Sequence, residues 1–133
     1  MPPRPLVLIV DDSALVTQAL GLLFEETGRR VAVAGSVGDA VRACRAERPA
    51  LMLLDLTLAD GDGLEVLQRL GGTDALPAVT VALTGHDDDA TVARCRAAGC
   101  RAVLLKPVPT RELLAMVEGW LDDGGASGDG REA

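Results

Sequence analysis

The stretch "LMLLDLTLADGDG", residues 51–63, joins an apolar run to an acidic, glycine-rich segment. Its first four residues are apolar, and Asp55 follows them directly. A short continuous apolar run of this kind is typical of a strand buried on both faces of a sheet. The chain therefore places a carboxylate at the end of a buried strand, and its chemistry depends on which groups lie near it there.

The composition indicates one acidic domain with an aliphatic core. The chain has 133 residues, is 48% hydrophobic but only 2% aromatic, and carries a net charge of −7. This length is enough for one compact domain. The excess of acid argues against nucleic acid or an anionic membrane as a direct partner, because both attract basic surfaces.

Neither a membrane span nor a zinc site is expected from the sequence. No apolar run approaches the roughly 18 residues that indicate a spanning helix. The acidic pair Asp11-Asp12 follows the N-terminal apolar run, where a signal peptide would have small residues. The three cysteines lack CxxC spacing and the chain has one histidine, so we expect reduced thiols in a cytoplasmic protein.

Strand-like and helix-like patterns alternate along the chain and predict an α/β fold. Helical periodicity fills the gaps between the apolar runs, which predicts a doubly wound (βα)5 parallel sheet with helices on both faces. The expected order is 2-1-3-4-5, which is flavodoxin-like, with the less apolar second run at an edge. We place this domain at residues 1–121, followed by a flexible, glycine-rich tail or linker at 122–133. The five predicted strands are residues 5–10, 30–34, 50–54, 78–83 and 102–105.

Polar residues end four of the five predicted strands. Asp11 and Asp12 follow the first strand, Asp55 the third, Thr84 the fourth and Lys106 the fifth. The carboxyl ends of parallel strands lie at one edge of the sheet, where ligands bind at the reversal of strand order. These side chains are therefore expected to meet.

The expected cluster suits phosphoryl chemistry. Three neighbouring carboxylates repel one another unless a cation neutralises them, and their oxygens suit Mg²⁺. A hydroxyl and an ammonium group opposite them match the needs of phosphoryl transfer. A carboxylate can itself be the nucleophile and form an acyl phosphate. The residues therefore suggest a Mg²⁺-dependent aspartyl-phosphate site.

Four motifs at these strand ends resemble the receiver domain of two-component response regulators. They are "VDDS", "LLDLTLADGDG", "ALTG" and "LLKPV", and the resemblance runs from about Pro5 to Leu121. It implies a phosphorylation-controlled signalling switch and not an enzyme. The phosphoryl donor would be a sensor histidine kinase or a phosphotransfer protein. An effector would bind the face formed by the fourth helix, fifth strand and fifth helix.

The resemblance also implies a role for each site residue. Asp55 would accept the phosphoryl group, and Thr84 and Lys106 would bind its oxygens. Mg²⁺, for which Mn²⁺ can substitute, would be held directly by Asp12 and Asp55, by Asp11 through water, and by the backbone carbonyl of Thr57. The Lys106-Pro107 bond would be cis.

Three positions depart from the family pattern. Ala59 replaces a common proline, which predicts a less rigid loop after Asp55. Gly85 replaces a common alanine and keeps the site open. Val103 stands where the family has its switch aromatic, so we expect the loop after Thr84 and the fourth helix to rearrange in place of an aromatic flip.

Alternative interpretations exist for the same residues. Asp11 to Ser13 could cap the first helix, and Thr84-Gly85 could be an ordinary turn. At the level of the whole chain, the alternatives are a non-phosphorylated interaction module with a receiver fold and an aspartate-based phosphatase of the haloacid-dehalogenase type. A calcium loop within "ADGDG" fails, because its first and twelfth positions would be Leu58 and Arg69. We therefore interpret residues 60–63 as a turn into the third helix.

Overall fold

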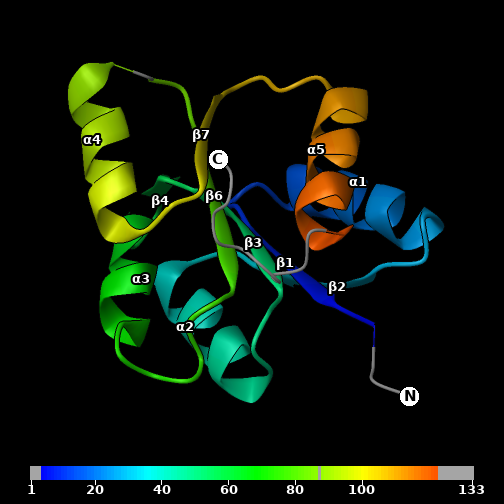
Figure 1. The fold of residues 1–133 in the computed structure, drawn as a ribbon, viewed down its shortest axis with the longest axis horizontal. Helices are drawn as coiled ribbons and strands as arrows, with labels where there is room; N and C mark the ends of the chain where they lie inside the picture. The colour runs from blue at the N-terminus through cyan, green and yellow to red at the C-terminus, as the bar shows by residue number, and fades with distance from the viewer. Residues whose placement is uncertain (1–3, 87, 123–133) are drawn as a thin grey trace.

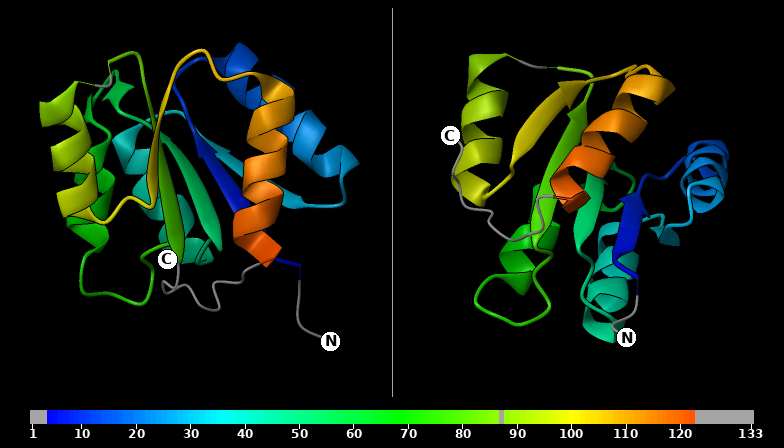
Figure 2. Two further views of the ribbon diagram at one scale, coloured as in Figure 1. Left: turned by 45° about the horizontal axis from the view of Figure 1, so that its top comes forward. Right: turned by 45° about the vertical axis from the view of Figure 1, so that its right-hand side comes forward.

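The computed structural model describes residues 4–86 and 88–122. Within them, a five-stranded parallel sheet in the order β2-β1-β3-β6-β7 lies between two layers of helices (Figures 1 and 2). The predicted fold class and strand order are therefore confirmed, and the second strand lies at an edge as expected. The sheet strands are β1 (Leu6–Val10), β2 (Arg30–Ala34), β3 (Leu51–Asp55), β6 (Val79–Thr84) and β7 (Ala102–Leu105).

Five helices cover the two faces of this sheet. The helices are α1 (Ala14–Glu26), α2 (Val37–Ala46), α3 (Leu64–Leu70), α4 (Asp89–Ala98) and α5 (Thr110–Asp122). In Figures 1 and 2, α2, α3 and α4 lie on one side of the sheet and α1 and α5 on the other. The core has two halves accordingly, because successive side chains of a strand point to opposite faces. In β1, Leu8 and Val10 belong to the first half and Val7 and Ile9 to the second.

The residues Val16, Ala19, Leu20 and Leu23 have the i, i+3, i+4, i+7 spacing of an amphipathic helix and predict one buried stripe, but the buried face of α1 differs from it. Its buried residues are Thr17, Gly21 and Phe24. Apolar residues occur all around this helix, and Leu15 and Leu22 remain 79% and 63% exposed. Periodicity alone could not choose among its faces; in the folded chain, Phe24 is wholly buried in the core.

Helix α4 is the least anchored of the five. Cys95 is its one buried residue, and its other apolar residues are mainly alanines. The three cysteines are buried and free, and burial raises the pKa of Cys44 to about 11 and that of Cys100 to about 12. These thiols are core groups.

A small hairpin follows β3 where a simple turn was expected. β4 (Thr57–Leu58) pairs antiparallel with β5 (Gly61–Asp62). The interpretation of residues 60–63 as a turn into α3 is therefore incomplete, because the chain first folds back on itself. Among the described residues, no helix is long and apolar enough to cross a membrane. Apart from Asp122, which ends α5, the predicted tail at 122–133 falls outside the described residues.

Candidate functional site

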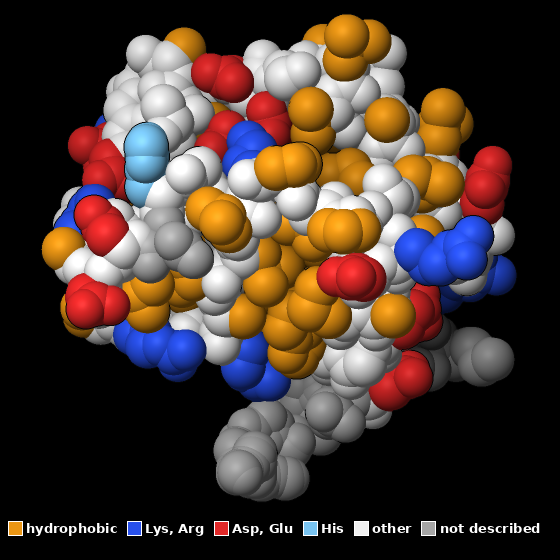
Figure 3. Space-filling view, turned by 90° about the horizontal axis from the view of Figure 1, so that it is seen from above, with side chains coloured by type: hydrophobic (Ala, Val, Ile, Leu, Met, Phe, Trp, Pro, Cys, Tyr) orange, Lys and Arg blue, Asp and Glu red, His pale blue; other side chains and the backbone are white. Residues whose placement is uncertain are grey.

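The polar strand ends meet at one edge of the sheet, as predicted. This edge is uppermost in Figure 1, and Figure 3 looks down on it: acidic side chains border a basic one there, and hydrophobic side chains gather nearby. Backbone hydrogen bonds continue past the strands and align their ends. The amide of Asp11 donates to Ala34 O at 3.0 Å, and that of Lys106 donates to Thr84 O at 2.8 Å.

Asp11, Asp12 and Asp55 form one carboxylate cluster. Each offers an oxygen, and these oxygens lie within 4.8 Å of one another. Asp11 and Asp55 are buried at 4% and 5% exposure, while Asp12 is exposed. The cluster thus has a closed side in the protein and an open side toward solvent. This geometry suits a hard cation that keeps some of its waters.

Lys106 supplies a positive charge beside the two buried carboxylates. Its Nζ lies 3.5 Å from Asp11 Oδ2 and 3.5 Å from Asp55 Oδ2. One ammonium group cannot neutralise three carboxylates, so the site retains net negative charge when these groups are ionised. Such a site attracts a divalent cation.

The pKa of Asp55 is raised by some of its surroundings and lowered by others. Burial raises its pKa, and the negative charge of Asp11 adds to that increase. The backbone N–H of Thr57 and the ammonium group of Lys106 act in the opposite direction. The Thr57 amide donates to Asp55 Oδ1 at 3.2 Å, which orients one carboxylate oxygen.

The Thr84 hydroxyl is engaged within its own loop. Its Oγ1 accepts from the His86 amide at 3.0 Å and donates to His86 O at 3.1 Å. Thr84 is buried at 5% exposure at the end of β6, beside β3. A phosphoryl oxygen that attracted this hydroxyl would therefore compete with the loop.

The predicted helix cap also exists and shares residues with the cluster. Ser13 caps α1 by accepting from Val16 N, while Asp11 Oδ1 accepts from the Ser13 amide at 2.9 Å. Capping accounts for one oxygen of Asp11 and leaves Oδ2 facing Lys106. The cap and the cluster coexist, so the first does not exclude the second.

Asp60 and Asp62 have structural roles that sequence reasoning missed. Asp60 Oδ1 accepts from the Val37 amide at 2.8 Å, and Asp62 Oδ1 accepts from the Leu64 amide at 2.9 Å. The two carboxylates thus serve two different helices and do not converge on one ion. No local signal predicts the Asp60 contact, because its partner lies 23 residues away.

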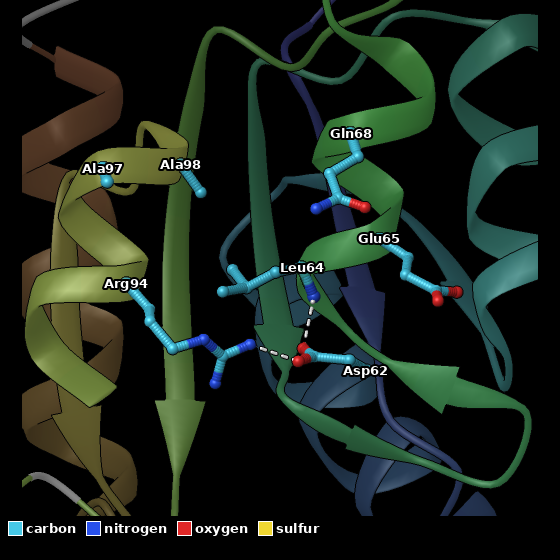
Figure 4. Close-up of a pocket in the computed structure, with 7 residues that line it drawn as sticks. All are labelled: Asp62, Leu64, Glu65, Gln68, Arg94, Ala97 and Ala98. Atoms are coloured by element: carbon cyan, nitrogen blue, oxygen red, sulfur yellow. Dashed lines mark hydrogen bonds and ion pairs between the residues drawn. The ribbon is translucent and has the colours of Figure 1, made fainter. Parts of the chain in front are cut away.

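Asp62 also forms an ion pair with Arg94 of α4 (Figure 4). The pair borders a groove between α3 and α4 that shares no residue with the carboxylate cluster. It links the hairpin after Asp55 to the weakly anchored α4. The groove is lined by Asp62, Leu64, Glu65, Gln68, Arg94, Ala97 and Ala98.

The structure shows what surrounds each of the three residues that depart from the family pattern. Ala59 lies at the turn of a hairpin whose position Asp60 holds, so the missing proline does not leave this loop without anchors. A Cβ added at Gly85 would meet no atom within 4 Å, which fits an open site. Val103 packs against the core half beneath α2, α3 and α4.

The chain belongs to the response regulator receiver domain family. The family's sequence profile matches residues 7–118. A CheY-like receiver domain from Methanospirillum hungatei superposes with a TM-score of 0.85 at 26% identity, covering 95% of this chain and 100% of that one. Receiver domains generally act as phosphoryl-accepting switches and bind Mg²⁺ at an acidic pocket, and the Asp11, Asp12 and Asp55 cluster lies where such a pocket is expected.

Two curated relatives are named as a transcriptional regulatory protein and a DNA-binding response regulator. The transcriptional regulatory protein AfsQ1 of Streptomyces coelicolor is 36% identical over 120 residues, which is 90% of this chain and 52% of AfsQ1. The DNA-binding response regulator MtrA of Mycobacterium tuberculosis is 33% identical over 114 residues, which is 86% of this chain and 49% of MtrA. The chain spans about half the length of these relatives.

The exclusion of nucleic acid as a partner was wrong. It rested on the net charge of these 133 residues, whereas relatives are named as DNA-binding and transcriptional regulators. Charge counted over a receiver describes the surface of that receiver alone. It carries no information about a nucleic-acid-binding region elsewhere in a regulator.

Proposed function

We propose that this chain is a Mg²⁺-dependent phosphoryl switch in which Asp55 accepts the phosphoryl group. The observation that carries this proposal is the cluster itself. Asp55 is buried beside two further carboxylates, and Lys106 Nζ lies 3.5 Å from its Oδ2. A histidine kinase or phosphotransfer protein would be the donor, as is general for two-component signalling.

Each residue of the cluster has a proposed task. Asp12, Asp55 and the carbonyl of Thr57 would hold Mg²⁺, with Asp11 acting through water; the bound ion would neutralise the charge between the carboxylate and the incoming phosphoryl group. Asp55 Oδ attacks phosphorus, and the bond from phosphorus to the donor nitrogen breaks. Lys106 and Thr84 bind the phosphoryl oxygens, the latter after leaving His86.

The direct test is phosphate incorporation from acetyl phosphate. Wild-type protein with Mg²⁺ should acquire one phosphate that is stable to acid and labile to base, measured as an added mass on the intact chain. EDTA or Asp12→Ala should suppress it, because the carboxylate charge would be uncompensated. Absence of label with Mg²⁺ would favour the interaction module, and steady turnover of free phosphomonoesters would favour the phosphatase.

Phosphorylation should change α4 more than it changes the sheet. Thr84 must release His86 to reach a phosphoryl oxygen, and α4 buries only Cys95, so a small free energy can shift it. Amide exchange of residues 88–98 should change by more than that of β1 and β3 when beryllofluoride is added. Equal exchange in both states would contradict this expectation, as would a change confined to the sheet.

The proposed output surface is the edge of the sheet at β7. An effector on the α4–β7–α5 face would meet Leu105, which is 47% exposed. By analogy with MtrA and AfsQ1, the switch would control a DNA-binding partner region of the regulator. We also expect a receiver domain at residues 1–121 and a cytoplasmic location. Phosphate-dependent pull-down of partners would test the output.

A further inference from the structure

The first turn of α2 is completed by a residue from another part of the chain. The first amides of a helix lack intrahelical partners. In α2, the Oγ of Ser36 satisfies one of them by accepting from Asp39 N at 3.0 Å, and the first intrahelical bond runs from Ala40 N to Ser36 O at 3.0 Å. Asp60 satisfies two more of them, accepting from Val37 N at 2.8 Å and from Gly38 N at 3.3 Å.

Asp60 lies at the turn of the hairpin that carries Thr57. The base of that hairpin is held by backbone bonds: Gly63 N donates to Leu56 O at 2.8 Å, and Leu56 N donates to Leu83 O at 3.2 Å. Asp60 holds the opposite end against α2. The hairpin of β4 and β5 is thus held at its base by the Leu56 and Gly63 bonds and at its turn by Asp60. Thr57 lies between these two attachments.

The contact is electrostatically favourable. A carboxylate at a helix N-terminus interacts well with the partial positive charge there. The Val37 amide is the main cause that lowers the pKa of Asp60. Asp60 is exposed, so it contributes little to the core, and its main structural effect is to connect the hairpin to α2.

We propose that Asp60 is a positioning residue for the metal site. By holding the hairpin against α2, it keeps the Thr57 carbonyl where Mg²⁺ is to be bound and the Thr57 amide against Asp55. Mg²⁺ requires near-ideal octahedral geometry, so a hairpin free to shift binds it less well. This inference rests on the proposed function, because it concerns the same site.

The test compares two caps of one helix. Asp60→Ala removes the bonds between hairpin and helix, and Ser36→Ala removes the other cap of α2 without altering the hairpin. Both weaken the helix end by similar amounts, about 1 kcal/mol by the usual worth of a cap. Isothermal titration of each folded, metal-free protein with MgCl₂ should show a Kd about tenfold higher for Asp60→Ala and unchanged for Ser36→Ala.

A conservative variant and a metal-free measurement complete the design. Asp60→Asn keeps an oxygen that can accept from Val37 N, so its Mg²⁺ affinity should stay near that of wild type. Without metal, amides 57–62 should exchange faster in Asp60→Ala than in wild type or Ser36→Ala.

Two failures can be told apart. Equal Mg²⁺ affinity in Asp60→Ala and Ser36→Ala, with a wild type that binds Mg²⁺, overturns the role of Asp60 and leaves the proposed function intact. A wild type that does not bind Mg²⁺ overturns the proposed function, and the role of Asp60 at a metal site falls with it. Unchanged exchange at residues 57–62 in Asp60→Ala would also overturn the positioning role.

Discussion

Asp55→Asn is expected to lose phosphate incorporation from acetyl phosphate, by on the order of 10³-fold or more, the scale seen when a covalent nucleophile is removed. The carboxylate oxygen is the attacking atom, and an amide of the same shape lacks its charge and nucleophilicity. The fold should survive, because Asn keeps the size of Asp and an oxygen that can accept from the Thr57 amide at Oδ1. Intact-mass spectrometry over time measures the effect.

A matched control separates loss of the nucleophile from loss of charge in general. Asp74→Asn makes the same chemical change at an exposed position outside the carboxylate cluster, and it should be labelled at the rate of wild type. Peptide mapping of the labelled wild type should place the phosphate on the peptide that contains Asp55. Labelling of Asp55→Asn at the wild-type rate would show that another residue accepts phosphate.

Gly63→Ala should destabilise the fold strongly. A Cβ at this position would lie 2.2 Å from the carbonyl oxygen of Asp55 and 3.0 Å from the Cα of Leu56. Both are backbone atoms, and Gly63 N donates a hydrogen bond to Leu56 O at 2.8 Å. Neither backbone segment can therefore shift without loss of stability. We expect a loss of about 3 kcal/mol in the free energy of unfolding, at the upper end for overpacking, measured by urea denaturation.

Gly85→Ala is the control for that substitution. The same methyl group would meet no atom within 4 Å there, and its effect should stay within about 0.5 kcal/mol, as for surface positions. The contrast tests whether the destabilisation comes from the close approach of backbone atoms at Gly63 or from replacing any glycine by alanine. If both variants lost equal stability, the contact between Gly63 and Asp55 would not be the cause.

Gly63 also links the fold to the site. Its contact with the Asp55 carbonyl brings the start of α3 against the strand that presents the phosphoryl acceptor. A shift there would displace Asp55 relative to Lys106, whose Nζ lies 3.5 Å away. Gly63→Ala that remains folded should therefore also take up phosphate more slowly than the wild type.

Much of the architecture was predictable from local patterns. Continuous apolar runs such as that ending in Asp55 identify strands buried on both faces, and the intervening helical periodicity requires crossovers that make the sheet parallel. A parallel sheet brings its strand ends together, so Asp11, Asp55, Thr84 and Lys106 could be expected at one edge. The residue types at the strand ends and the alternation of strands and helices were sufficient to predict where these side chains lie.

Other features depend on contacts between distant segments. The buried face of α1 is centred on Thr17, Gly21 and Phe24 because that face packs on the sheet, whereas the sequence presents apolar residues on several sides. The bonds from Asp60 to Val37 and Gly38 join residues 23 and 22 positions apart, and Asp62 reaches Arg94 across a groove.

The amino-acid sequence by itself determined the strands, their parallel arrangement and the polar groups at their ends, because these follow from short-range periodicity and composition. Only the tertiary structure decided which oxygen of Asp11 faces Lys106, where the Thr84 hydroxyl is engaged, and what holds the loop that carries Thr57. Those are matters of direction and distance between side chains from separate elements, and a one-dimensional pattern carries neither.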